Sequence, residues 1–256
     1  MPGLRQAIPG LPKNSAGAFL RRLERVLRRL RRRRGRRLRW NVPSTGWAID
    51  GTWFDRPIGD HGRRALVVVE LNSRRTLCVE SVPGERAMAV VECLQRLVAK
   101  HGAPLVLKAD NGSAFLSQLV ADFCQRHEIA LMHSPVSLPS WNGTCEVSGR
   151  WAKARATAAA RQRGASQLTQ ADLDRAVTYD GVLPPVDPAL RASFRAVLQR
   201  ELAAVAAEQG LALDDSARDH VRRSLGRVAA KRALQICHIL TIEGRGFPQW
   251  LSRRTA

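Results

Sequence analysis

The chain has 256 residues, which is enough for one domain with a sizeable core and an accessory region. Its 42 Lys and Arg residues against 22 Asp and Glu residues give a net charge of +20, typical of a protein that binds a polyanion. No apolar run approaches the ~18 residues that cross a bilayer, so we expect no membrane span and take nucleic acid as the first expected partner.

The first residues, MPGLRQAIPGLPKNSAG, lack the features of an export signal. They contain neither a charged region followed by a long apolar segment nor a small-residue cleavage site. We therefore expect a cytoplasmic protein associated with the nucleoid. The five cysteines, which are widely scattered and form no C-x-x-C pair, are expected to be reduced structural thiols rather than disulfides or zinc ligands.

Residues 17–39 predict an amphipathic basic helix that Gly35 interrupts. Its apolar stripe consists of four leucines at steps of three and four residues, Leu20, Leu23, Leu27 and Leu30. The remaining positions are almost all arginine. Two interpretations stay open: a solvated tail that binds any polyanion weakly, or a DNA-binding arm. In the second, phosphates are contacted by Arg28, Arg32 and Arg36.

From residue 46 the hydrophobic period changes to that of strands. The stretches 47–54, 63–71 and 74–82 are short apolar or β-branched runs with turn-like residues between them. This pattern predicts an antiparallel meander of three strands.

Alternating helices and strands follow the meander. The predicted order is helix 84–102, strand 103–110, helix 113–129, strand 130–136 and helix 144–164. Because helical crossovers join parallel neighbours, the strands 47–54, 103–110 and 130–136 should lie side by side. The pattern therefore predicts an α/β fold with a mixed five-stranded sheet flanked by helices, and the residues after 164 predict a C-terminal helical region.

Three carboxylates stand out against this predicted sheet. Asp50 lies in the first strand, Asp110 ends the fourth, and Glu146 opens the helix after the fifth, with the 35 residues 111–145 between the last two. Each has an ordinary alternative, because aspartate is common in turns and glutamate is favoured at a helix N-terminus. Clustered carboxylates repel one another unless a cation compensates, and their hard oxygen atoms suit Mg²⁺ or Mn²⁺.

Four stretches, WAIDGTW, LNSR, KADNGSAF and SPVSLPSWNGTCE, resemble in order and spacing the superfamily of DDE transposases and retroviral-type integrases. The resemblance covers roughly residues 46–164 and implies an RNase H-like catalytic core. It also implies that Asp50, Asp110 and Glu146 are the catalytic triad and hold two Mg²⁺ or Mn²⁺ ions. Two such ions, about 3.5 to 4 Å apart, can activate a hydroxyl and stabilise the leaving oxygen in phosphodiester displacement.

Further residues are assigned by the same resemblance. The active-site loop would be formed by Asn111, Gly112, Asn142 and Gly143. Basic residues four and seven places after the catalytic glutamate contact DNA in retroviral-type integrases, and here Arg150 and Lys153 occupy those places. On a helix both share a face with Glu146. The alternative is an ordinary surface pair of Glu146 with Arg150.

These observations divide the chain into a basic N-terminal arm (1–45), an integrase-like core (46–164) and a C-terminal helical region (165–256). We expect a homo-oligomer that cleaves the DNA ends of a mobile element and transfers them to target DNA. Two alternatives remain: an idle DNA-binding relic or regulator, and an RNase H-like nuclease that never joins strands.

Overall fold

The computed structural model describes four stretches of the chain, residues 37–84, 86–135, 139–210 and 219–243. Of the described residues, 40–241 form one compact unit, and 37–39 with 242–243 belong to a second. A two-stranded sheet pairs β1 (Arg37–Trp40) with β7 (Leu240–Glu243). Three arginines of the predicted basic arm, Arg28, Arg32 and Arg36, lie outside the described residues.

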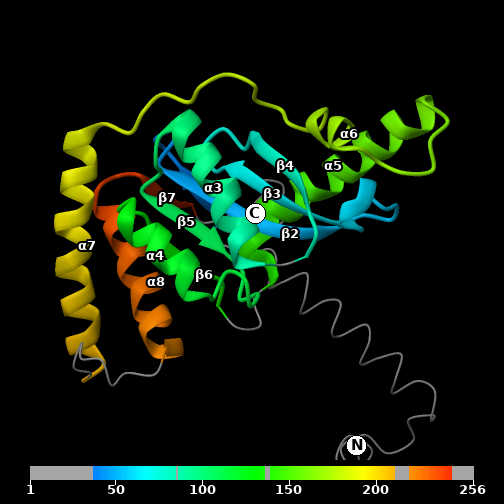
Figure 1. The fold of residues 1–256 in the computed structure, drawn as a ribbon. Coiled ribbons are helices and arrows are strands. Elements are labelled where there is room, and N and C mark those ends of the chain that lie inside the picture. The colour runs from blue at the N-terminus through cyan, green and yellow to red at the C-terminus, as the bar shows by residue number, and fades with distance from the viewer. Residues whose placement is uncertain (1–36, 85, 136–138, 211–218, 244–256) are drawn as a thin grey trace, which may run out of the picture. The chain divides into compact units, whose positions relative to one another are not determined.

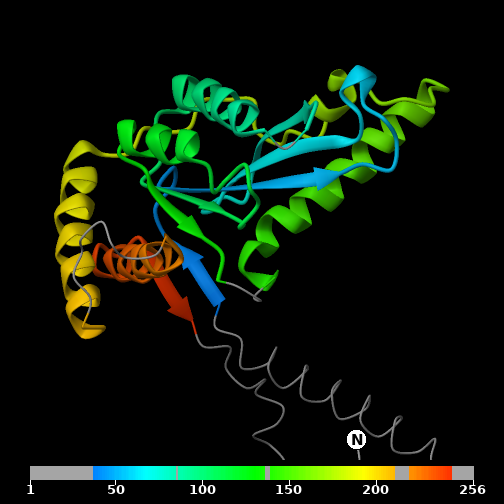
Figure 2. The same ribbon diagram turned by 60° about the horizontal axis from the view of Figure 1, so that its bottom comes forward.

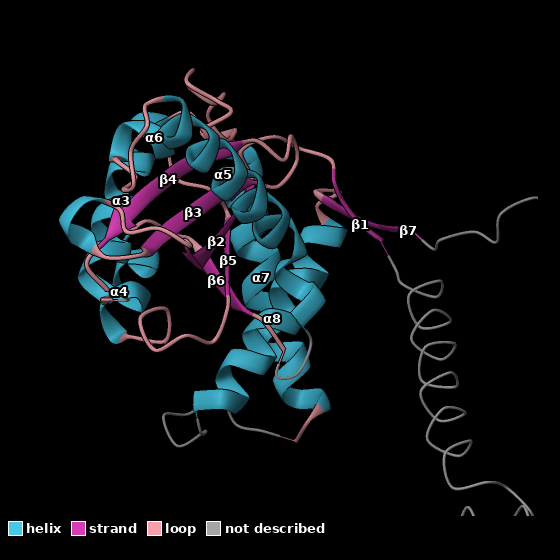
Figure 3. Cartoon of the chain, turned by 90° about the vertical axis from the view of Figure 1, so that its right-hand side faces the viewer, coloured by secondary structure: helices cyan, strands magenta, loops and turns pink. Residues whose placement is uncertain are grey.

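A mixed five-stranded sheet forms the centre of the unit 40–241. Its strands are β2 (Gly46–Trp53), β3 (Arg64–Glu70), β4 (Thr76–Val82), β5 (Val106–Ala109) and β6 (Ala130–His133). The spatial order is β4-β3-β2-β5-β6, in which β2, β3 and β4 are antiparallel and β5 and β6 run parallel to β2 (Figures 1 and 3). This confirms the predicted α/β class, and the order is that of the RNase H-like fold.

Helices cover both faces of the sheet. α3 (Ala87–His101) and α4 (Gln118–Arg126) lie on one face, and α5 (Gly143–Gln162) lies on the other (Figure 2). α3 stops at Gly102, whose φ of 76° suits glycine. α4 begins five residues later than predicted, because turns follow Gly112 and the Ser117 side chain caps the helix by accepting from the Val120 N–H.

Successive side chains along β2 point to opposite faces of the five-stranded sheet. Trp47 and Ile49, 1% and 0% exposed, pack into the main apolar core with residues of α3 and α4. Asp50 and Thr52 line a cavity together with residues of α5. Burying each large apolar side chain contributes about 1.5 to 3 kcal/mol, so the position of Asp50 on the α5 face is set by the burial of its neighbours.

Three helices follow α5, namely α6 (Gln170–Asp174), α7 (Pro188–Glu208) and α8 (Asp219–Ile236). α6 contacts β4, while α8 contacts both β6 and α7 (Figures 1 and 3). The short α6 was not predicted; Thr169 and Asp172 stabilise it as a capping box. No helix within the described stretches is long and apolar enough to cross a membrane. The three-part functional division of the chain stays a prediction.

Candidate active site

Two of the three predicted catalytic carboxylates belong to neighbouring parts of the sheet, because Asp50 lies in β2 and Asp110 follows the last residue of β5. β2 pairs with β5 in a register that sets Ala48 opposite Lys108. Asp50 lies two residues beyond Ala48 within β2, while Asp110 lies two residues beyond Lys108 and directly after the end of β5. Because side chains alternate along a strand, Asp50 belongs to the face that α5 covers, and we expect the same of Asp110.

The sheet opens beside Asp50, since β5 ends at Ala109 while β2 continues to Trp53. Along that continuation β2 is paired only with β3 within the described sheet, as in the pair Asp50–Val67. The loss of the neighbouring strand leaves space for a cavity next to the carboxylate.

The chain turns sharply after Asp110. The Gly112 N–H donates to Asp110 Oδ1 at 2.8 Å, and a Cβ atom on Gly112 would lie 3.0 Å from that same oxygen. The Asn111 side chain donates to the Ser134 carbonyl at 2.9 Å and so ties the turn to the chain after β6. Asn111 and Gly112 therefore shape the turn that holds the Asp110 carboxylate.

The start of α5 is anchored to the two central strands. Asn142, which is 6% exposed, donates from Nδ2 to the Ile49 carbonyl at 3.3 Å. Lys108 Nζ donates to the Trp141 carbonyl at 2.8 Å and lies 4.9 Å from the centre of the Trp141 ring. Asn142 is the N-cap residue of α5 and Gly143 its first residue. These contacts fix where Glu146, in the first turn, emerges.

A strip of small residues lets α5 approach β2 closely. A Cβ atom on Gly149 would lie 3.3 Å from Thr52 Oγ1. The other residues of this strip are buried alanines, Ala152, Ala156, Ala159 and Ala160. Since Gly149 follows Glu146 by about one turn, the close approach brings the glutamate to the edge of the cavity.

The cavity has a volume of about 450 Å³ and is lined by acidic and basic side chains. Its lining includes Asp50, Glu146, Arg150 and Lys153. The predicted helical face of Glu146, Arg150 and Lys153 therefore borders one space. Asp110 is not part of the lining, so the structure brings together two of the predicted carboxylates and both predicted basic residues at this cavity.

The pKa of the Cys145 thiol is raised by all three carboxylates. Burial raises its pKa most, the charge of Asp50 raises it further, and Glu146 and Asp110 add smaller effects in the same direction. Lys108 opposes them. All three carboxylates therefore lie near enough to Cys145, a residue that is 1% exposed, to raise the pKa of its thiol.

The oxygen atoms of Asp50, Asp110 and Glu146 do not all lie within 4.8 Å of one another. Within the described stretches, the one group of three potential metal-ligand side chains whose ligand atoms lie within 4.8 Å of each other is found elsewhere, at Cys78, Glu80 and Cys93. Glu146 is exposed, so its side chain can change rotamer without disturbing the core. The donor set is hard oxygen, which fits Mg²⁺ or Mn²⁺.

Several residues of the site were not singled out in the sequence. Lys108 is 6% exposed, and burial lowers its pKa to about 8. A lysine inside an otherwise apolar strand was the available signal. The contact of Gly149 with Thr52 could not be predicted in this way, because the sequence does not indicate which residue a glycine within a helix packs against.

Part of the chain is similar to known proteins. Residues 41–138 match the family model described as Integrase core domain. That segment contains Asp50 and Asp110, while Glu146 lies beyond it. A stretch of 107 residues is 31% identical to "Uncharacterized protein K02A2.6" of Caenorhabditis elegans, covering 42% of this chain and 8% of that protein. The match thus spans a small part of a much longer protein.

Solved structures of viral integrases are similar in part. The catalytic core domain of BIV integrase is 26% identical, with 52% of this chain and 80% of that chain covered and a TM-score of 0.42. The HTLV-2 integrase catalytic core domain in complex with magnesium is 21% identical, with 54% and 86% covered and a TM-score of 0.45. A simian T-cell lymphotropic virus intasome is 19% identical, with 56% and 54% covered and a TM-score of 0.47.

Proposed function

We propose that this chain, whose residues 41–138 match the family model described as Integrase core domain, is a metal-dependent polynucleotidyl transferase that cleaves DNA and joins its ends to a target. One observation carries the proposal. Asp50 lies in β2 and Asp110 directly follows β5, the parallel neighbour of β2, while α5 holds Glu146 at the cavity that Asp50 lines. The +20 net charge supports DNA as the substrate.

Asp50, Asp110 and Glu146 would hold the metal ions, and we propose two Mg²⁺ or Mn²⁺ ions per site. Bound ions supply Lewis-acid activation of a water or 3′-hydroxyl and neutralise charge on the transferring phosphate. The protein supplies the rigid part of the site: Asp110 is oriented by the Gly112 N–H, and the start of α5 is held by Asn142. The exposed Glu146 side chain would complete the ligand set.

Arg150 and Lys153 would position the DNA. Both line the cavity beside Glu146, where they can contact the phosphates that flank the reacting bond. Their contribution is binding and orientation, which matters because a misplacement of about 1 Å can cost ~10²-fold in rate. Pairing two DNA ends requires at least two active sites, so we propose that the working form is a homo-oligomer.

The proposal is tested with purified chain, supercoiled plasmid and end-labelled short duplexes, with Mn²⁺ or with chelator. We expect nicked plasmid and labelled joint products only when Mn²⁺ is present. Binding without nicking would identify an idle DNA-binding relic or regulator. Nicking without any labelled joint product would identify a nuclease that lacks strand transfer. Either result overturns the assignment.

A further inference from the structure

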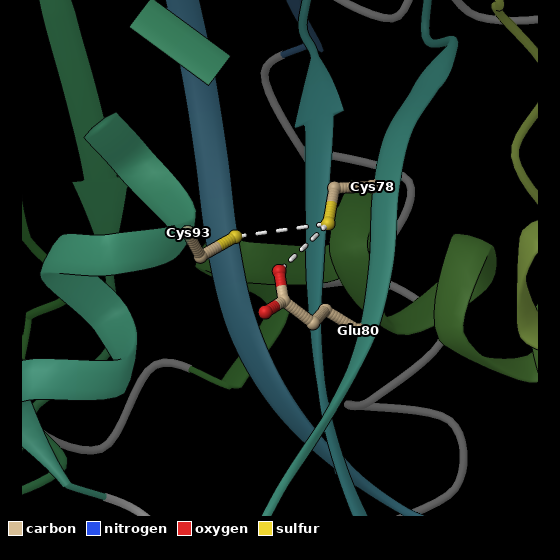
Figure 4. Close-up of side chains that lie close together, drawn as sticks. All are labelled: Cys78, Glu80 and Cys93. Carbon is tan, nitrogen blue, oxygen red and sulfur yellow. Dashed lines mark hydrogen bonds between the residues drawn. The ribbon is translucent and has the colours of Figure 1, made fainter. Parts of the chain in front are cut away.

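A second group of potential metal ligands lies on the face of the sheet opposite the candidate active site. Cys78 and Glu80 are two residues apart on β4 and so point to the same side, toward Cys93 of α3 (Figure 4). Cys78 Sγ lies 3.6 Å from Cys93 Sγ and 3.7 Å from Glu80 Oε2. All three ligand atoms lie within 4.8 Å of one another.

We propose that Cys78, Glu80 and Cys93 form a Zn²⁺ site that joins α3 to β4. Ligand atoms bound at ~2.0 to 2.3 Å to a tetrahedral Zn²⁺ lie about 3.4 to 3.8 Å apart, which matches the two measured separations. Two thiolates select Zn²⁺ over Mg²⁺, the ion expected at the carboxylate site. The three side chains leave the fourth tetrahedral position for a water.

Arg96 gives the site a second set of interactions. Its Nη2 donates to Glu80 Oε1, while Glu80 Oε2 faces the Cys78 thiol. When one carboxylate oxygen is held by a hydrogen bond, the other oxygen faces an ion in a defined direction. Hydrogen-bond partners of metal ligands commonly orient the ligands in this way. Two thiolates and one carboxylate bound to Zn²⁺ leave a single negative charge, and the Arg96 guanidinium balances it.

An entry path for the ion is present. Cys78, Glu80 and Cys93 all line a cavity of about 920 Å³, which also contains Arg96 and Lys100. The Cys93 residue is 0% exposed overall and is one of the residues that line this cavity. The cavity gives the fourth ligand, a water, room on the open side of the site.

The ordinary alternative is a pair of reduced thiols packed in the core. In that case Cys78 would need no polar partner, yet its thiol faces the Glu80 carboxylate, which in turn contacts Arg96. Without an ion the Cys93 thiol carries its proton, because the hydrogen bond with Cys78 and then burial raise the pKa of Cys93 well above its usual range. Zn²⁺ uptake would therefore release protons.

The test uses the full chain, stripped of metal and kept reduced with a phosphine. Titration with Cd²⁺, a thiophilic probe for Zn²⁺ sites, should give a thiolate-to-metal charge-transfer band that saturates at one equivalent per chain and is reversed by Zn²⁺ but not by Mg²⁺. Cys78→Ser and Cys93→Ser should abolish the band. Glu80→Gln keeps both thiols and should weaken Cd²⁺ binding by about 10- to 100-fold.

Two matched variants separate this site from other thiols. Cys124→Ser changes a buried thiol of α4, and Cys145→Ser changes the thiol beside the candidate active site; both should retain the band. Circular dichroism of the metal-free variants controls for folding, and Glu80→Gln remains decisive if a serine variant does not fold. A missing band, full affinity in Glu80→Gln, or loss of the band only in Cys145→Ser would overturn the proposal.

Discussion

Gly149 of α5 lies so close to Thr52 of β2 that a Cβ atom on the glycine would stand 3.3 Å from Thr52 Oγ1. This contact sets the distance between the helix that carries Glu146 and the strand that carries Asp50. The geometry of the candidate site therefore depends on a glycine that takes no part in its chemistry.

Replacing this glycine tests the close contact, and Gly226 of α8 offers a matched control. A Cβ on Gly226 would meet no atom within 4 Å. Gly→Ala in a helix should stabilise by up to about 1 kcal/mol, and we expect that gain for Gly226→Ala. For Gly149→Ala the tight contact should cancel the gain and reduce cleavage. Denaturant unfolding of both variants checks this, and equal gains would show that α5 does not depend on the contact.

Asn142→Ala should loosen the start of α5. It removes the bond from Nδ2 to the Ile49 carbonyl and leaves a buried acceptor without that donor. The expected loss is about 1 to 3 kcal/mol of unfolding free energy, together with lower cleavage because Glu146 is less well placed. Asn111→Ala breaks an exposed bond to the Ser134 carbonyl and should cost less than 1 kcal/mol or so. Similar losses in both variants would contradict the anchoring role of Asn142.

The buried Lys108 side chain should give the free energy of unfolding an unusual dependence on pH. Burial lowers its pKa to about 8 in the folded chain, below its value in the unfolded chain. Between those two values the unfolded state binds more protons, so the free energy of unfolding should rise with pH. The total rise is at most roughly 3 kcal/mol.

Lys108→Met removes this titration while nearly preserving side-chain length. The difference between the unfolding free energies of the wild type and the variant, measured from about pH 7 to pH 10, isolates Lys108 because other titrations cancel. We expect the free energy of unfolding of the wild type to increase relative to that of the variant as the pH rises. Parallel curves would mean that Lys108 is not buried as a charged group in the folded chain.

Arg150→Glu combined with Lys153→Glu should abolish cleavage and joining while the fold is retained, since only DNA placement at the cavity is lost. The control is Arg155→Glu combined with Arg161→Glu, which makes the same charge change at exposed positions of the same helix. Plasmid nicking at physiological salt distinguishes the two pairs. Equal losses would assign the effect to net charge rather than to position.

Periodicity predicted the central part of the fold well. The strands and helices from β2 to α5 have strong period-2 or helical patterns, and helical crossovers required β2, β5 and β6 to be parallel neighbours. The capped α6 was missed because five residues are too few to show a period. The β1–β7 pair was missed because it joins segments about 200 residues apart, and no local pattern records such a partner.

The site was predictable only in outline. Asp50 and Asp110 could be expected near each other because β2 and β5 are parallel neighbours, and the shared helical face of Glu146, Arg150 and Lys153 followed from their spacing. The anchors at Lys108 and Asn142 and the approach of Cys78 to Cys93 depend on side chains packed between separate elements. The two cysteines lie 15 residues apart, in a strand and a helix, and no metal-ligand spacing marks them.

The proposed function requires Asp50, Asp110 and Glu146 to act together as the metal-binding triad. Asp50→Asn, Asp110→Asn and Glu146→Gln each remove one charge at nearly constant size, and Glu92→Gln does the same at an exposed position of α3. The decisive measurement is the rate of Mn²⁺-dependent plasmid nicking by all four variants. The account predicts that each triad variant loses at least ~10²-fold in rate but still binds duplex DNA, while Glu92→Gln matches the wild type. Nicking by Asp110→Asn at the wild-type rate would contradict it.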